Sequence, residues 1–203
     1  MNRSKHPLTR LFVPAAAVAA LCLTGPAAAQ DADDLAEVTS WLQQGVNSAL
    51  LTQAQADVML EALRGQSAAT EALIRQQVNE ALNLSAMAKA AIAEEFLTNG
   101  TAAVDRVAAG LSAAAEDTQG RYVRSLDVVR GEIFVTYGND AHSALAGKVI
   151  ALTPYVTDSG YLVWQCGLSS HGASQGYAPI GGTSGNGVTT VPELYLPSSC
   201  SRE

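Results

Sequence analysis

The spacing of apolar residues changes halfway along this chain, and that change limits its possible folds more than any other feature. Across residues 67–100 apolar residues recur every three to five positions, as on one face of a helix. From Tyr122 onwards apolar and polar residues alternate, as in half-buried strands. One long helix followed by a run of short strands predicts an α+β fold.

The helical stretch at residues 67–100 carries a continuous apolar stripe. Its members are Leu73, Ile74, Val78, Ala81, Leu82, Met87, Ala88, Ile92 and Phe96. We expect Asn99-Gly100 to end the helix. Such a stripe needs an apolar surface to cover it, and the second half of the chain can supply a sheet.

Short apolar runs joined by turn residues predict an antiparallel meander of four strands. A turn at Arg130-Gly131 separates "YVRSLDVV" from "GEIFVTYG", and residues 157–159 separate "KVIALTPYV" from "GYLVWQCG". We expect the long helix to lie across one face of this sheet. Residues 101–120 are too many for a simple turn, and loops of this length are often binding surfaces.

The segment at residues 30–66 predicts a short helical hairpin. Its first helix has an apolar face formed by Leu35, Val38, Trp41 and Leu42, and we expect Gly45 to end or loosen it. A capping box of Thr52 and Gln55 begins the second helix, and Gly65 is its expected C-cap. The hairpin would pack on itself or on a partner.

Residues 1–29 have the layout of a cleaved secretory signal peptide. A basic start precedes an apolar core at residues 11–23, and the A-x-A pair predicts cleavage after Ala29. The core is too short for a membrane span, which needs about 20 apolar residues. A lipid anchor on Cys22 fits less well, because the bulky Leu21 precedes it. The predicted organisation is therefore signal peptide 1–29, helical hairpin 30–66 and globular domain 67–203, with no membrane anchor after cleavage.

The mature chain is strongly acidic. Removing residues 1–29 removes three cations and no acid, so nine Lys and Arg remain against 19 Asp and Glu, a net charge of −10. Such a chain repels phosphate backbones, so nucleic acid is not a favoured partner. No Cys/His cluster has the spacing of a metal site, and we expect no metal and no cofactor.

The candidates for catalysis do not form a recognisable site. Glu94 and Glu95 are adjacent on a helix and point about 100° apart, so they are unsuited to sharing a site. We expect His142 to be solvated and Trp164 to be core or half-buried, and the sequence indicates no evident partner for His171. The sequence therefore predicts no catalytic residue and no enzyme.

Cys166 and Cys200 are the cysteines that remain after signal cleavage. Two cysteines in an exported chain favour a disulfide over a reactive pair. Residues 167–190 include 14 Gly, Ser or Thr among 24 residues. Such a segment has too few apolar groups to offset its ordering entropy, so we expect it to need a clamp.

Five segments in order carry a family resemblance. They are "QVNEALNLSAMAKAAIAEEFLTNG", "GRYVRSLDV", "IFVTYGNDAHSALAGKVIALTP", "LVWQCG" and "LPSSC". Together they resemble the globular region of type IVa pilins of Gram-negative bacteria, from about residue 77 to residue 200.

The resemblance implies a pilin-like roll, in which a long N-terminal helix packs on a four-stranded antiparallel sheet. It implies that residues 101–120 form the variable loop after the helix. It also implies that a Cys166–Cys200 disulfide bounds an exposed surface segment. In the chain-entropy model, closing a loop of about 35 residues stabilises a fold by roughly 3–4 kcal/mol.

Pilins build filaments that support adhesion, twitching motility and DNA uptake. The resemblance therefore implies a structural or adhesion protein of type IV pili, exported to the periplasm or to the cell surface of a Gram-negative bacterium. Its partners would be other pilins, pilus-assembly proteins or a surface receptor. The alternative is a soluble periplasmic module that binds a protein or a small ligand. In both cases the binding residues are unknown.

The N-terminal region departs from the family pattern. Pilins begin with a short basic leader, a glycine cut site and a hydrophobic helix with a glutamate five residues in. The corresponding region here carries Asp31, Asp33, Asp34 and Glu37. Burying these carboxylates in a filament core would cost more than it returned. We expect a soluble variant that does not enter a membrane or a filament in the usual way.

Overall fold

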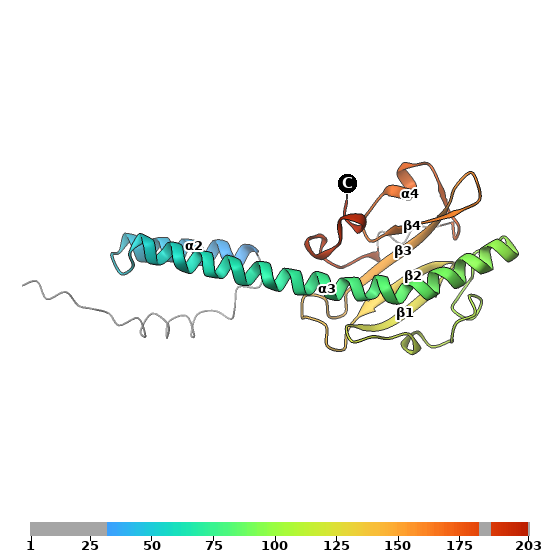
Figure 1. The fold of residues 1–203 in the computed structure, drawn as a ribbon, viewed down its shortest axis with the longest axis horizontal. Helices are drawn as coiled ribbons and strands as arrows, with labels where there is room; N and C mark the ends of the chain where they lie inside the picture. Colours follow the sequence, from blue (N-terminus) through green and yellow to red (C-terminus); the bar gives the residue numbers. More distant parts are fainter. Residues whose placement is uncertain (1–31, 183–187, 203) are drawn as a thin grey trace, which may run out of the picture. The chain divides into compact units, whose positions relative to one another are not determined.

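The computed structural model describes residues 32–182 and 188–202 (Figure 1). The predicted signal peptide and its cleavage site lie outside the described residues. The chain divides into two compact units, Met1–Ala68 and Ala69–Glu203, and each is described by itself.

The first unit contains helix α2, Ala32–Asn47, and the start of helix α3, Gln53–Asn99. The predicted capping box is confirmed at the start of α3. The Thr52 amide donates to Gln55 Oε1 at 2.9 Å, and the Gln55 amide donates to Thr52 Oγ1 at 3.3 Å. Leu42 and Ala56 are buried, so the hairpin has a small apolar centre of its own.

Two predicted helix ends are wrong. Gly45 lies inside α2, which continues to Asn47, and a Cβ at Gly45 would meet Leu51 Cδ1 at 2.9 Å. Gly65 lies inside α3, which is continuous from Gln53 to Asn99 and crosses the predicted boundary between residues 66 and 67. A glycine costs a helix interior about 1 kcal/mol, and good helix formers on both sides of Gly65 offset that cost.

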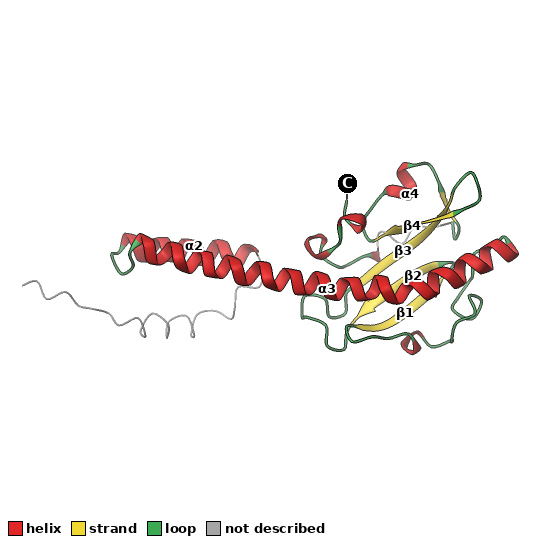
Figure 2. Ribbon diagram, viewed as in Figure 1, coloured by secondary structure: helices red, strands yellow, loops and turns green. Residues whose placement is uncertain are grey.

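The second unit places the rest of α3 on an antiparallel sheet, and the predicted α+β fold is confirmed (Figures 1 and 2). The sheet order is β1-β2-β3-β4, with strands Val123–Val129, Glu132–Tyr137, Val149–Val156 and Leu162–Cys166. A short strand that the pattern did not predict, β5 (Ala178–Pro179), also pairs with β3. The remaining elements are α4 (His171–Ser174) and three 3-10 turns, η1 (Ala115–Asp117), η3 (Glu193–Tyr195) and η4 (Ser198–Cys200).

The predicted turns lie where expected. Arg130 and Gly131 both have positive φ, 50° and 80°, and they join Val129 to Glu132, which face each other across β1 and β2. Two consecutive left-handed residues are the signature of a tight hairpin turn whose twist matches the strands. Helix α3 ends at Asn99, and Gly100 adopts a φ of 71° with its amide donating to the Phe96 carbonyl, as expected for a C-cap.

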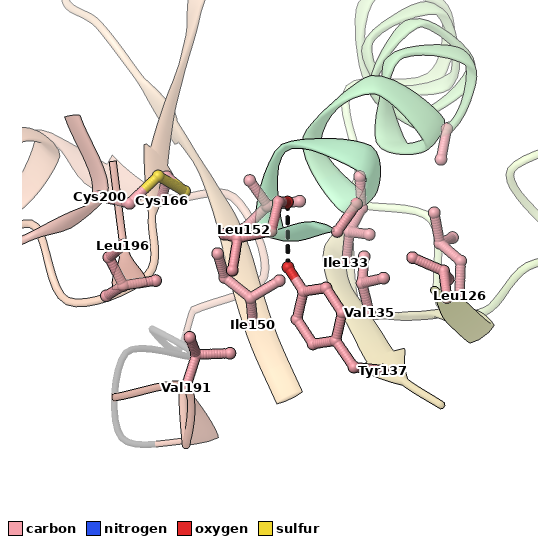
Figure 3. Close-up of a cluster of buried hydrophobic side chains, with 14 of the residues drawn as sticks. Leu126, Ile133, Val135, Tyr137, Ile150, Leu152, Cys166, Val191, Leu196 and Cys200 are labelled. Carbon is pink, nitrogen blue, oxygen red and sulfur yellow. Dashed lines mark hydrogen bonds between the residues drawn. A yellow bond between two sulfur atoms is a disulfide. The ribbon is translucent and has the colours of Figure 1, made fainter. Parts of the chain in front are cut away.

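The core lies between α3 and the sheet. The helix residues buried in it are Ile74, Val78, Ala81, Ala88 and Ile92. The Tyr137 hydroxyl donates to the Val78 carbonyl at 3.1 Å and ties β2 to the helix (Figure 3). Burial in this core raises the pKa of Tyr137, and the Glu80 carboxylate adds to the shift.

Two members of the predicted stripe are exposed instead of buried. Leu73 and Met87 are 60% and 78% exposed. Each precedes a buried residue by one position, and a one-residue step turns a side chain about 100° away from the sheet. Within the described residues, no helix is both long enough and apolar enough to cross a membrane.

Candidate interaction surface

A disulfide joins the end of β4 to the last turn of the chain. Cys166 and Cys200, the two cysteines that the family resemblance pairs, are bonded with a Cα–Cα distance of 4.6 Å (Figure 3). Residues 167–199 between them are called the tail below. The tail therefore leaves and rejoins the sheet at the same place.

The tail is also bonded directly to β3, which the sequence did not predict. The Val149 amide donates to Thr190 Oγ1 at 2.9 Å, and the Thr190 amide donates back to the Val149 carbonyl at 2.8 Å. The Ala151 amide donates to Thr189 Oγ1 at 3.1 Å. β4 pairs with residues 152–156 of β3. Thr189 and Thr190 bond to the preceding residues of β3, beyond the end of β4.

A second part of the tail pairs with the other end of β3. The Ile180 amide donates to the Pro154 carbonyl at 3.1 Å, next to β5. A Cβ at Gly181 would lie 2.1 Å from the Arg130 carbonyl oxygen, so the tail passes the hairpin turn where only glycine fits. The tail is thus fixed at several points, and the expectation that it depends on a clamp alone is incomplete.

Helix α4 of the tail packs on buried sheet residues. Gln165 is 2% exposed, and its Oε1 accepts from the amides of Gly172 at 2.9 Å and Ala173 at 3.2 Å. A Cβ at Gly172 would lie 2.6 Å from the ring of Tyr155. These contacts bring α4 directly onto β3 and β4.

The loop at residues 101–120 is held by a buried arginine. Arg106 is 3% exposed, and its Nε donates to the Ser112 carbonyl at 2.6 Å. Its Nη2 donates to Thr118 Oγ1 at 3.0 Å, and its Nη1 donates to the Leu126 carbonyl of β1. The Ser112 hydroxyl donates to the Asp117 carboxylate, which ties the loop to its own 3-10 turn.

The loop and the tail meet over the β1–β2 turn. A Cβ at Gly131 would touch Ile180 Cδ1 at 3.0 Å and Ala102 Cβ at 3.2 Å, so both segments contact this glycine. We call residues 101–120 and 178–182 together the loop–tail surface. Val104 and Val107 are 66% and 60% exposed on it.

The remaining candidate residues are separate from this surface. His142 is half-buried rather than solvated. Its backbone amide donates to Gln77 Oε1 at 2.8 Å, and its Nδ1 accepts from the Ala144 amide. Trp164 is half-buried, as expected, and the Lys89 ammonium lies 5.6 Å from its ring centroid. In the described part of the chain, no group of three or more His, Cys, Asp and Glu is placed to hold a metal ion.

Sequence reasoning missed Arg106, Gln165, Thr189 and Thr190. Each is a single polar residue without a periodic pattern, and its role depends on which distant backbone group it meets. The abundance of threonine and glycine in the tail indicated flexibility, whereas the structure uses both residue types for close contacts with the sheet.

Comparison with known proteins agrees with this fold. Residues 75–201 match the family model of the pilins, described as bacterial filament proteins. The chain is 29% identical over 130 residues to the fimbrial protein of Neisseria meningitidis serogroup A / serotype 4A, an alignment that covers 62% of this chain and 75% of that protein. It is also 29% identical over 94 residues to the type IV major pilin protein PilE1 of Neisseria gonorrhoeae, covering 46% of this chain and 56% of that protein.

The chain thus spans three quarters of the first relative and a little over half of the second. The matched region contains the sheet-covering half of α3, the loop at residues 101–120, all five strands and the disulfide. The predicted type IV pilin globular domain is confirmed. The chain therefore belongs to the pilin family, whose members are structural proteins of bacterial filaments.

Proposed function

We propose that this chain is a structural and adhesion protein associated with type IV pili, and that its loop–tail surface binds a neighbouring pilin, an assembly protein or a receptor. The observation that carries this proposal is the fixation of the tail. The Cys166–Cys200 disulfide, the Thr190–Val149 bonds and β5 hold a Gly- and Ser-rich segment against the sheet. A binding surface held in one conformation loses less entropy on association.

We propose further that the chain is a soluble variant that does not insert into a membrane. Three acids of the first unit, Glu37, Asp57 and Glu61, are exposed. A helix that bore these carboxylates in a filament core would have to bury them without partners, at a cost of several kcal/mol per ion. The N-terminal helices would instead remain in water.

The chemistry of the chain favours some partners over others. The net charge of −10 calculated for the mature chain disfavours nucleic acid. We propose no catalytic role and no cofactor. The site of action would be the periplasm or the cell surface of a Gram-negative bacterium, reached by export with the predicted signal peptide.

The proposal can be tested with sheared pili. The protein should co-purify with the pilus fraction, and a deletion strain should lose piliation or adhesion. Val107→Asp changes the loop–tail surface and should reduce adhesion, whereas Val58→Asp, at an exposed site on the first unit, should not. Equal adhesion in the Val107→Asp strain and the wild type would contradict the assignment of this surface.

The second candidate is a soluble periplasmic binding module. It is favoured by the exposed apolar residues of the first unit, since Trp41, Leu50 and Val58 are 51%, 80% and 70% exposed. Such residues could dock a partner protein. Recovery of the protein only as a periplasmic monomer, with normal piliation in the deletion strain, would favour this candidate over the first.

A further inference from the structure

Strand β1 lies at an edge of the sheet and needs protection from unwanted pairing. It pairs with β2 on one side only. The backbone groups on the free side of an edge strand are a template for a strand from another molecule. The residues whose backbone groups point outward alternate along an antiparallel strand, here Leu126 and Val128, and Arg130 of the turn continues this alternation.

Each of these three residues has a partner from the chain itself. The Arg130 amide donates to the Val104 carbonyl at 3.0 Å, and Asp105 forms an isolated antiparallel bridge with Val129. The Val128 amide donates to the carboxylate of its neighbour Asp127 at 2.8 Å. The end of the free edge is therefore covered by the first residues of the loop.

The middle of the edge is covered by Arg106. Its Nη1 donates to the Leu126 carbonyl, while Nε and Nη2 hold Ser112 and Thr118 in the loop. A guanidinium has five donors in a rigid fork, so one side chain can join a strand edge to two points of a loop. A lysine has no equivalent geometry.

The burial of Arg106 is difficult to explain by stability alone. It is 3% exposed, and the acceptors of its three bonds are two carbonyls and a hydroxyl, all neutral. A buried cation with neutral acceptors recovers little of its desolvation cost, and an apolar side chain of similar size is often equally stable. A role in determining which surfaces of the chain can associate accounts for the position of Arg106 better than a role in stability.

We propose that Arg106 is an edge guard, which holds residues 104–106 over β1 and prevents β1 from pairing with β1 of a second copy of this chain. Two identical strands can pair around a two-fold axis in the antiparallel sense, so release of the loop would expose a self-complementary edge. The guard would confine association to other surfaces. This inference does not depend on the proposed role in pili.

The test compares Arg106→Met with the wild type and with Arg124→Met. The methionine keeps the length and apolar stem of Arg106 and removes its donors, while Arg124 is an exposed arginine of β1. Hydrogen exchange of the Arg130 amide should become roughly tenfold faster in Arg106→Met only, a change that corresponds to about 1.4 kcal/mol. Its mass in solution should rise with concentration more steeply than that of the wild type or Arg124→Met.

A second substitution identifies the edge as the route of association. Val129→Lys places a charge at an exposed position of β1, and edge lysines prevent strand pairing. In the Arg106→Met background it should return the mass to the wild-type value without slowing exchange of the Arg130 amide. Association that persists in the double variant would overturn the proposal, and so would an Arg106→Met protein whose mass does not change with concentration.

A milder variant covers the case in which Arg106→Met does not fold. Thr118→Val removes one acceptor of the guanidinium and retains the arginine. It should increase exchange at the Arg130 amide and the tendency to self-associate, both by less than Arg106→Met would. Wild-type values for both measurements in a folded Thr118→Val protein would overturn the proposal.

Discussion

The carboxylate of Glu80 in α3 accepts a hydrogen bond from the amide of Tyr122, 2.6 Å away, at the point where the chain enters β1. Its second oxygen accepts from the Arg121 amide at 2.8 Å. One side chain of the helix thus fixes the end of the loop at residues 101–120 and the start of the sheet. Bonds to a charged acceptor are stronger than neutral ones.

We therefore expect Glu80→Ala to lower the free energy of unfolding by about 2–3 kcal/mol, because two amides lose a charged acceptor. Glu80→Gln should cost less, since its amide oxygen can still accept one of the bonds. Urea denaturation measures both changes, and Glu94→Gln, at an exposed position of the same helix, is the matched control. A Glu80→Ala protein with the stability of this control would contradict the assigned role.

Gly120→Ala should break the same contact from the other side. A Cβ at Gly120 would lie 2.5 Å from Glu80 Oε1 and 2.9 Å from Leu84 Cδ1. The carboxylate cannot withdraw without losing its bonds to Arg121 and Tyr122, so we expect a cost of about 2 kcal/mol.

The double variant Glu80→Ala/Gly120→Ala distinguishes this coupling from simple crowding. Its total loss of stability should be clearly smaller than the sum of the two single losses, because the alanine at position 80 leaves room for the new methyl group. Additive losses in urea denaturation would show that the two residues act independently.

Gly65→Ala should stabilise the protein, in contrast to Gly120→Ala. Gly65 lies in the interior of α3, and nothing lies within 4 Å of a Cβ placed there. Alanine is favoured over glycine in a helix by about 1 kcal/mol. Thermal unfolding followed by circular dichroism should show a higher midpoint, and a lower midpoint would argue against a regular helix at this position.

The helices, strands and turns of this fold could be predicted from the sequence because the residues within each element indicate its conformation and its buried face. The apolar stripe containing Ile74 and Val78 indicated a buried helix face, and Arg130-Gly131 indicated a hairpin turn. The continuity of α3 through Gly65 could not be predicted, because a glycine is compatible with either a C-cap or a helix interior. The choice depends on the energies of all the neighbouring residues.

The contacts that organise the candidate surface could not be predicted for a different reason. Arg106 bonds to Leu126, and Thr190 bonds to Val149, across many residues of sequence. A single polar residue in a loop carries no periodic pattern that identifies its partner. The pairing of Cys166 with Cys200 could be predicted because two cysteines remain after signal cleavage, and the family resemblance implied the same bond.

Reduction of the disulfide should release the end of the tail before the rest. Cys200 loses its bond to Cys166, whereas Thr189 and Thr190 remain bonded to β3 and Ile180 remains bonded to Pro154. We therefore expect protease cleavage of the reduced protein to occur first within residues 191–202. Thr190→Val, which removes a bond worth about 1 kcal/mol, should extend cleavage towards residue 188.

Limited proteolysis with mass spectrometry, with and without reductant, locates these cuts. Thr98→Val, at an exposed position near the end of α3, is the control for the loss of a hydroxyl. A reduced protein whose tail is as protease-resistant as the oxidised form would contradict the role of the disulfide. Equal cleavage in the reduced wild type and in reduced Thr190→Val would contradict the role of the threonine.

Lys89 should make stability depend on pH at alkaline values. Burial beside Trp164 lowers the pKa of Lys89 below its ordinary value of 10.5. At pH values between the lowered pKa of Lys89 in the folded state and its ordinary pKa in the unfolded state, the unfolded chain binds more protons than the folded protein does. The Lys89 contribution to stability therefore rises with pH through this window and is least favourable below it.

Lys89→Met removes this dependence and keeps most of the side-chain volume. The difference in free energy of unfolding between wild type and Lys89→Met should shift in favour of the wild type as the pH rises towards 10.5. Comparing the two proteins also cancels the opposing effect of Tyr137, whose raised pKa destabilises the folded state above the ordinary tyrosine value of 10.0. A difference that stays constant across this range, measured by urea denaturation, would show that the folded protein does not perturb the Lys89 ammonium.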